Sequence, residues 1–298
     1  MERTLPAGLT DIHCHGGGGY YFSDPNPENI SKAIATHKNS GTVNLVASLV
    51  TDSLDNLQAQ ISRLIPFYER GEIAGIHLEG PYLSRRRCGA HEPELLRTPV
   101  LDGIKNLLDC GQGAIAMVTI APELDGAIQA IDYLTKQNVI PAIGHSDGSY
   151  DDARAGIDAG ASIVTHFTNA MSKLTDPQPS FASAVLADSR IDLELIVDGV
   201  HVPQEIIRQI FEVAAGRVIL VSDAMSAAGC ADGHYSIGRL EVDVHDSVAR
   251  LRSNGALAGS TLTLKQAVDN AARFGITEEV AKSAATSNPI SLLSRLKP

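Results

Sequence analysis

Tryptophan is absent from this sequence, and aromatic residues make up only 4% of its 298 positions. Proteins that hold single-stranded nucleic acid stack its bases on aromatic side chains, so a role of that kind is excluded. Positive charge is also scarce, since 24 Lys and Arg face 35 Asp and Glu and leave a formal net charge of −11. Because such an excess repels phosphate backbones and anionic lipid, we expect no nucleic-acid partner and no membrane partner.

Cysteine pairs and long apolar runs are missing as well. The four cysteines, Cys14, Cys88, Cys110 and Cys230, are spread along the chain without a Cys-x-x-Cys motif. A chain of this length buries enough apolar surface to fold without disulfides. No apolar run reaches the roughly 18–20 residues of a transmembrane helix, and the first residues lack the apolar segment of a signal peptide. We therefore expect reduced cysteines and a cytoplasmic location.

What the sequence does contain is a repeating order of short apolar runs and longer amphipathic stretches. The apolar runs are rich in β-branched residues and predict strands over 9–13, 42–50, 73–78, 114–120, 139–143, 161–165, 193–197 and 218–221. Helical spacing between several of these runs indicates a parallel sheet covered by helices. Eight strands in a chain of 298 residues favour a closed (β/α)₈ barrel over an open doubly wound sheet.

One segment interrupts this order. Residues 235–252 lie between the eighth strand and the last expected helices, over 262–274 and 277–286, and their alternation predicts a two-stranded insertion. No linker, repeat or low-complexity segment divides the chain. We therefore expect a single barrel domain over residues 1–298.

Polar side chains that bind metals follow the predicted strands. In (β/α)₈ enzymes the carboxyl ends of the strands meet at one face, where the catalytic residues lie. The strand-end residues are His13, His15, Glu79, His145, His166 and Asp223. Each alone has an ordinary explanation, such as a helix cap or a buried histidine, but burying all of them needs a joint reason. Nitrogen and oxygen donors suit a divalent metal, Zn²⁺ foremost and Fe²⁺ or Mn²⁺ as alternatives, so we predict a metal site there.

A series of short motifs runs in order along nearly the whole chain. The first is Asp-x-His-x-His-Gly at 11–16. The others are HLEGPY at 77–82, GAH at 89–91, GHSD at 144–147, THFTNAM at 165–171, DGVH at 198–201, SDAM at 222–225, LAGSTL at 257–262 and ATSNP at 285–289. Together they resemble the N-acetylglucosamine-6-phosphate deacetylase family of the amidohydrolase superfamily. The resemblance implies a metal-dependent barrel enzyme that hydrolyses the acetamide of an N-acetyl amino sugar to acetate and the free amine.

The resemblance also implies roles for single residues and a homodimer. One or two divalent ions per chain would be bound by Glu79, His145 and His166, and by His13, His15 and Asp223. Asp223 would act as general base and acid, and His91 would contact the acetamide carbonyl. The sugar site would be lined by Ala90, His91, Asn169, Ala170, His201, Leu257, Ala258 and Gly259.

Because the sequence departs from the family pattern at some positions, it does not decide which N-acetylated compound is the substrate. The family's accessory β-sandwich domain, made from both chain ends, is expected to be absent, because His13 comes early and few residues follow the last motif. The family arginine that grips the substrate phosphate is replaced near Pro177, where Lys173 is the nearest cation. A non-phosphorylated N-acetyl amino sugar, cyclitol or glycoside intermediate therefore stays beside the 6-phosphate as a substrate. The basic run at 85–87 is either a solvated loop or an anion-attracting lid beside His91.

Two other functions compete with this one. A ring-opening amidase of the dihydroorotase kind carries a carboxylated lysine between its third and fifth strands, and Glu79 at the end of the third strand counts against it. A sugar-binding barrel that has lost catalysis predicts that metal ligands are missing, whereas all six candidates are present. Metal analysis of the purified protein separates these possibilities.

Overall fold

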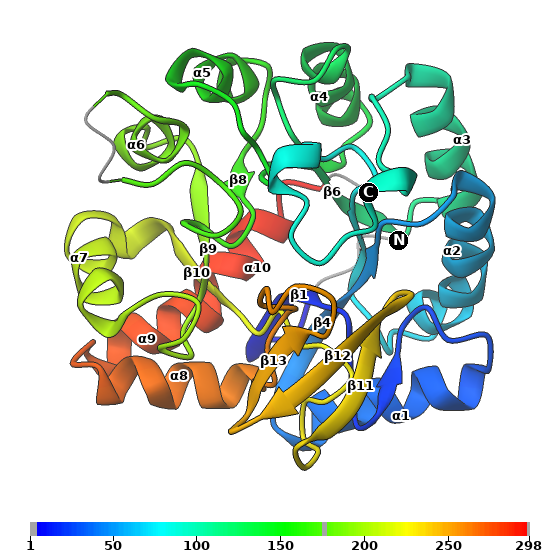
Figure 1. Ribbon diagram of the computed structural model, residues 1–298, viewed down its shortest axis with the longest axis vertical. Coiled ribbons are helices and arrows are strands. Elements are labelled where there is room, and N and C mark those ends of the chain that lie inside the picture. Colours follow the sequence, from blue (N-terminus) through cyan, green and yellow to red (C-terminus); the bar gives the residue numbers. More distant parts are fainter. Residues whose placement is uncertain (1–4, 175–177, 297–298) are drawn as a thin grey trace.

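The computed structural model describes residues 5–174 and 178–296. Its central sheet has eight parallel strands, and each of them pairs with the next of the eight along the chain (Figure 1). These strands are β1 (Leu9–Cys14), β4 (Thr42–Val50), β5 (Gly75–Glu79), β6 (Ile115–Ile120), β7 (Ile140–Ile143), β8 (Ile163–Val164), β9 (Asp192–Ile196) and β10 (Val218–Val221). The predicted parallel barrel is confirmed, and every predicted strand overlaps an observed one.

The barrel closes where the first strand meets the last. A parallel bridge joins Cys14 to Ala224, and the Asp223 N–H donates to the His13 carbonyl at 2.9 Å. Beside this contact, the Ser222 N–H donates to Asp11 Oδ1 at 3.2 Å. Residues that are more than 200 positions apart in the sequence are thus neighbours at the seam.

Helices surround the strands (Figure 1). They are α1 (Pro27–Asn39), α2 (Leu54–Glu69), α3 (Leu101–Gly111), α4 (Ala127–Lys136), α5 (Tyr150–Asp158), α6 (Phe181–Ala187), α7 (Gln204–Ala214), α8 (Leu264–Arg273), α9 (Glu278–Ala285) and α10 (Ser287–Leu293). In α7, Ile207, Ile210 and Phe211 recur at helical spacing and are buried, which is why this face packs inward. Within the described ranges, no helix is both long enough and apolar enough to cross a bilayer.

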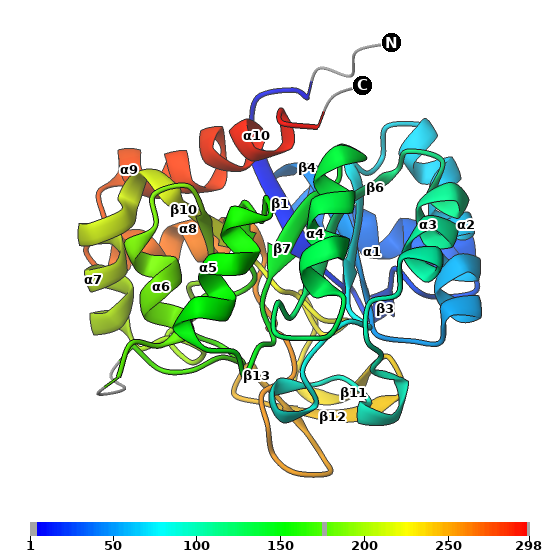
Figure 2. The ribbon, with the colours of Figure 1, turned by 90° about the horizontal axis from the view of Figure 1, so that it is seen from above.

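The two ends of the barrel differ in chemistry. Leu292 and Leu293 of α10 are buried with Ile196, Ile219 and Val221 in one apolar cluster. Figure 2 shows α10 beside the beginning of β1, on the opposite side of the barrel from β11 and β12. The amino-terminal end is therefore closed by apolar packing, and the polar strand ends lie at the other mouth.

The expected two-stranded insertion is wrong, because the segment forms three antiparallel strands. They are β11 (Gly233–Ile237), β12 (Leu240–His245) and β13 (Val248–Leu251). The run that reads as one strand is split by a turn in which Gly238 has a φ of 53°, a conformation that glycine adopts without strain. Ile237, Val242 and Leu251 pack with Met225 beneath this sheet, so it is anchored beside the end of β10.

Candidate active site

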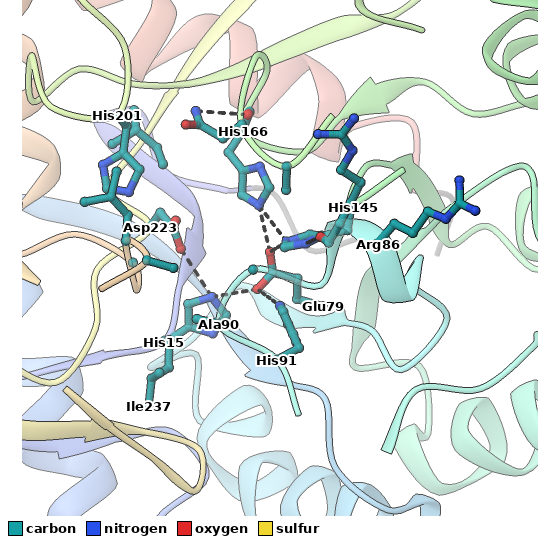
Figure 3. A pocket seen from close by; sticks show the side chains of 18 residues that line it. His15, Glu79, Arg86, Ala90, His91, His145, His166, His201, Asp223 and Ile237 are labelled. Atoms are coloured by element: carbon teal, nitrogen blue, oxygen red, sulfur yellow. Dashed lines mark hydrogen bonds and ion pairs between the residues drawn. The ribbon is translucent and has the colours of Figure 1, made fainter. Parts of the chain in front are cut away.

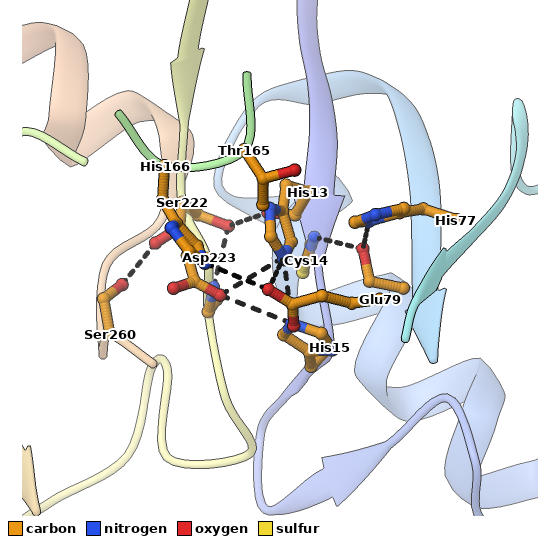
Figure 4. Close-up of polar contacts among 12 residues, drawn as sticks. His13, Cys14, His15, His77, Glu79, Thr165, His166, Ser222, Asp223 and Ser260 are labelled. Carbon is orange, nitrogen blue, oxygen red and sulfur yellow. Dashed lines mark hydrogen bonds and ion pairs between the residues drawn. The ribbon is translucent and has the colours of Figure 1, made fainter. Parts of the chain in front are cut away.

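All six candidate metal ligands meet at the carboxyl mouth of the barrel. His13 lies within β1 and Glu79 is the last residue of β5. The others, His15, His145, His166 and Asp223, lie within two residues after β1, β7, β8 and β10 respectively. Figure 3 shows five of these side chains pointing toward one another and Figure 4 adds His13, although the six come from five strands.

Glu79 stands at the centre of the cluster and is 3% exposed. Its Oε1 atom lies 3.0 Å from His166 Nε2 and 3.1 Å from His145 Nε2. Its Oε2 atom lies 3.1 Å from His15 Nε2 and 3.4 Å from His91 Nε2. One carboxylate thus presents its two oxygens to two different sets of imidazoles.

A second group of donors joins both histidines of the first strand to Asp223, with His15 at Glu79 Oε2 and His13 Nε2 at 3.5 Å from Glu79 Oε1. His13 Nε2 lies 3.1 Å from His15 Nε2, and Asp223 Oδ1 lies 3.3 Å from His15 Nε2 (Figure 4). Side-chain donor atoms of His13, His15 and Asp223 all lie within 4.8 Å of one another, as do those of Glu79, His91 and His145. Ring nitrogens and carboxylate oxygens at such spacing are donors for a divalent cation.

Neighbouring carboxylates raise the pKa values of His13, His15 and His166 against the effect of burial, whereas His145 and Asp223 already have the protonation that a cation needs. His145 Nδ1 lies 2.7 Å from the Arg87 carbonyl, so Nδ1–H donates and the Nε2 lone pair faces Glu79. Burial lowers the pKa of His145 to about 4. Burial alone would raise the pKa of Asp223, yet His13 and His15 hold it at about 2. At neutral pH the mouth therefore presents a neutral imidazole and an ionised carboxylate, which fits a metal site.

Three of the candidate ligands have an unusual backbone. His145, His166 and Asp223 have φ values of 47°, 29° and 46°, in the left-handed region that costs energy for residues other than glycine. A hydrogen bond holds the turn at His145, because Glu123 accepts from the Asp147 N–H at 2.8 Å. Strain of this kind gathers at functional sites.

A cavity of about 310 Å³ opens above the cluster, a size typical of small-molecule sites. Its lining includes most of the residues expected around the sugar, namely Ala90, His91, Asn169, Ala170, His201, Leu257 and Gly259. Ala258 differs from that expectation: it does not line the cavity and is fully buried in the apolar cluster beneath β11–β13. His201 is held by Asp198, whose Oδ2 lies 2.6 Å from His201 Nδ1.

The basic run forms a rim of the cavity. Arg86 and Arg87, in the 3₁₀ turn η1 (Arg85–Arg87), line it. Their guanidinium groups share Asp147, at 3.2 Å for Arg86 and 2.9 Å for Arg87. Lys173 is exposed, and Pro177, where the family arginine is replaced, lies outside the described residues. Arg86 and Arg87 are therefore the cations that the described residues place at the cavity.

Sequence reasoning missed other residues of the site. Ile196, Ile237 and Ala256 also line the cavity, and Glu194 contacts His13 from within β9. A signal for Glu194 was present, because it interrupts the apolar strand LELIV at 193–197 with a charge. Its partner lies 181 residues away, and sequence spacing gives no means of finding such a contact.

No family model matches the chain, but proteins of known function are similar to it. An N-acetylgalactosamine-6-phosphate deacetylase from Escherichia coli O157:H7 is 37% identical over 98% of this chain and 78% of its own length. An N-acetylglucosamine-6-phosphate deacetylase from Vibrio furnissii is 32% identical over 91% of this chain and 68% of its own length.

A solved structure that is similar to this chain is also a deacetylase of this kind. A variant of N-acetyl-D-glucosamine-6-phosphate deacetylase from Mycobacterium smegmatis, in complex with N-acetyl-D-glucosamine-6-phosphate, superposes with a TM-score of 0.93. It is 44% identical, and the match covers 97% of this chain and 77% of that one. Identity at this level over most of both chains, together with the same barrel, shows that the chain belongs to the N-acetylglucosamine-6-phosphate deacetylase family of hydrolases.

Proposed function

We propose that the protein removes the acetyl group from a 6-phosphorylated N-acetyl hexosamine, giving acetate and the free amino sugar. One observation carries this proposal: five imidazole side chains lie within 3.5 Å of the Glu79 carboxylate, beside Asp223, at the floor of a cavity of small-molecule size. The names of the similar proteins supply the substrate class, since they act on N-acetylglucosamine or N-acetylgalactosamine carrying a 6-phosphate.

The residues present fit one or two divalent cations, with Zn²⁺ foremost and Fe²⁺ or Mn²⁺ as alternatives. Glu79, His145 and His166 would hold the first ion, and His13, His15 and Asp223 the second, with Glu79 between them. When bound, such an ion lowers the pKa of a water molecule and polarises the amide carbonyl.

Asp223 is suited to move the proton. Because His13 and His15 lower its pKa against the effect of burial, its carboxylate is ionised at neutral pH, and its place at the cavity lets it accept the proton of the attacking water. It then carries that proton to the nitrogen of the leaving amine, which must not depart as an anion. Unlike Asp223, the buried His13 has no surface on the cavity and takes no part in this transfer.

His91 is suited to hold the carbonyl oxygen. Its Nδ1 atom accepts from the Thr51 N–H at 3.3 Å, so the proton of the neutral ring sits on Nε2, the atom that faces Glu79. A donor aimed at an oxygen that gains negative charge is worth roughly 3 kcal/mol of transition-state stabilisation. His91 would therefore orient the acetamide and stabilise the developing oxyanion.

A panel of substrates tests this function. Acetate release should be measured with N-acetylglucosamine-6-phosphate, N-acetylgalactosamine-6-phosphate and the two sugars without phosphate. We expect both phosphorylated sugars to turn over, with kcat/KM at least tenfold above that of the free sugars. Equal kcat/KM with and without phosphate would favour a non-phosphorylated substrate, and sugar binding without acetate release would favour a catalytically inactive barrel.

The remaining expectations from the family likeness stay proposals. We propose that residues 1–298 act as one barrel domain, that two chains associate as a homodimer, and that the enzyme works in the cytoplasm. Light scattering of the purified protein measures the mass of the assembly, and a monomer at working concentration would contradict the homodimer.

A further inference from the structure

One buried carboxylate at the mouth of the barrel touches two candidate metal ligands without facing the cavity. Glu194 lies in β9 and is 0% exposed, and it is absent from the cavity lining. We propose that Glu194 is a positioning residue that fixes His13 for a second cation at His13, His15 and Asp223. This inference rests on the metal site of the proposed function and deepens it.

The Glu194 carboxylate contacts the ring of His13. Glu194 Oε2 lies 2.9 Å from His13 Nδ1. Because a carboxylate only accepts hydrogen bonds, Nδ1 of the His13 ring carries a proton, and in the neutral ring the lone pair is on Nε2. That Nε2 atom lies 3.1 Å from His15 Nε2 and 3.5 Å from Asp223 Oδ1. Glu194 therefore selects the tautomer that a cation at this place requires.

The Glu194 carboxylate also contacts the backbone of His166. The same Oε2 atom accepts from the His166 N–H at 3.0 Å, and the Glu194 carbonyl accepts from the Phe167 N–H at 2.8 Å. One oxygen thus ties strand β1 to the turn after β8. The ring of His166 is free of this contact and faces Glu79, so the carboxylate orients the ring of His13 but only the backbone of His166.

Burying the Glu194 carboxylate has a free-energy cost. A buried carboxylate is costly unless charge or hydrogen bonds compensate for it. Among the described residues, Glu194 Oε1 has no hydrogen-bond partner, so the compensation rests on Oε2. A divalent cation on the far side of the His13 ring would polarise its N–H toward Glu194 and offset that cost. The carboxylate is thus explained by an ion bound through His13.

The ligands of the first ion depend less on Glu194, which reaches only one of them, His166, and only through its backbone N–H. His145 is oriented by the Arg87 carbonyl at 2.7 Å, and Glu79 lies on another strand. Loss of the Glu194 charge should therefore weaken the second ion much more than the first. Removing such a supporting carboxylate typically lowers metal affinity 10–100-fold.

The Glu194→Gln variant tests this, because it keeps the shape of the side chain and removes its charge. Protein loaded with Zn²⁺ would be dialysed against graded chelator, and the bound zinc counted by elemental analysis. We expect two ions in the parent protein, and in the variant one ion held normally and one weakened at least tenfold. Asp192→Asn is the matched control on the same strand, since Asp192 pairs with Arg295 at 2.8 Å away from the site.

A double-mutant cycle separates positioning from a general loss of structure. If Glu194 acts through His13, Glu194→Gln should change zinc affinity little in a His13→Asn background, and a larger effect would overturn the proposal. It would also be overturned if the parent protein bound a single ion or if both ions kept their affinity in the variant. Zinc counts do not depend on the substrate, so a failed acetate assay would contradict the proposed function without contradicting this inference.

Discussion

The two carboxylates at the carboxyl mouth of the barrel, Glu79 and Asp223, have different functions. Glu79 turns one oxygen to His145 and His166 and the other to His15. Asp223 lies beside the second set and also lines the cavity. Glu79 lines the cavity too, but its two oxygens face imidazoles, so Asp223 is the carboxylate better placed to act on the attacking water.

We expect Asp223→Asn to lower kcat by a factor of about 10²–10⁴, the usual contribution of a positioned general base. The amide of Asn cannot accept a proton from water, while the ion at Glu79, His145 and His166 keeps its ligands. Initial rates of acetate release and zinc counts on the same samples measure both effects. Asp243→Asn on the distant β12 strand is the control, and unchanged turnover in Asp223→Asn would remove this residue from proton transfer.

The six candidate ligands could be found from the sequence because each follows an apolar run. The parallel barrel then brings strand ends together, whatever their separation in the chain. Ala258 shows the limit of this reasoning, since its neighbours Leu257 and Gly259 line the cavity while Ala258 is buried in the cluster beneath β11–β13. Glu194 shows the same limit, because a contact across the barrel depends on which way a side chain faces.

At the scale of elements, the strands were easier to predict than several helices. Runs such as TVNLVASLV in β4 are apolar and β-branched, which favours buried strands. Helix α1 was missed because its sequence, PENISKAIATHKN, mixes Ser, Thr and His among few apolar positions. Its start was nevertheless marked by Asn26, which accepts from the Glu28 N–H, followed by Pro27.

We predict that Arg86 and Arg87 of the turn η1 bind the phosphate of the substrate. Arg86→Ala and Arg87→Ala should each raise KM for a 6-phosphorylated sugar about tenfold, because a charged hydrogen bond to phosphate contributes about 1.5–3 kcal/mol. We expect kcat and the KM of the unphosphorylated sugar to stay unchanged, since neither side chain contacts the candidate metal ligands. Initial-rate kinetics with both sugars measure this difference.

Arg85→Ala is the matched control, because Arg85 belongs to the same turn and does not line the cavity. The anion-binding role is contradicted if Arg86→Ala and Arg87→Ala change KM for both sugars equally, or change neither. In that case the basic run is a solvated loop whose charge is balanced by Asp147.

For the molecule as a whole, the buried donors make stability depend on metal. His13, His15, Glu79, His145 and His166 are all at most 5% exposed, and a cation that binds only the folded protein stabilises it. At free metal 1,000-fold above Kd the gain is about 4 kcal/mol, which corresponds to about 8 °C in Tm for a chain of this size.

Thermal unfolding with and without chelator measures this gain. Since imidazole ligands must be unprotonated, the difference in Tm should shrink as the pH falls from 8 toward 5. Chelator saturated with Zn²⁺ in advance is the control for effects of the chelator itself. Identical Tm values in metal and in chelator would show that no stabilising ion is bound.

The seam between β1 and β10 has a consequence for biosynthesis. His13 emerges from the ribosome early, but the backbone partner of its carbonyl is Asp223, far along the chain. Ribosomes add residues in order, so nascent chains that end before the last barrel strand lack both the proton carrier and the hydrogen bond across the seam. Products terminated before Asp223 should therefore be inert toward acetylated sugars, and catalysis begins only after the last barrel strand has been made.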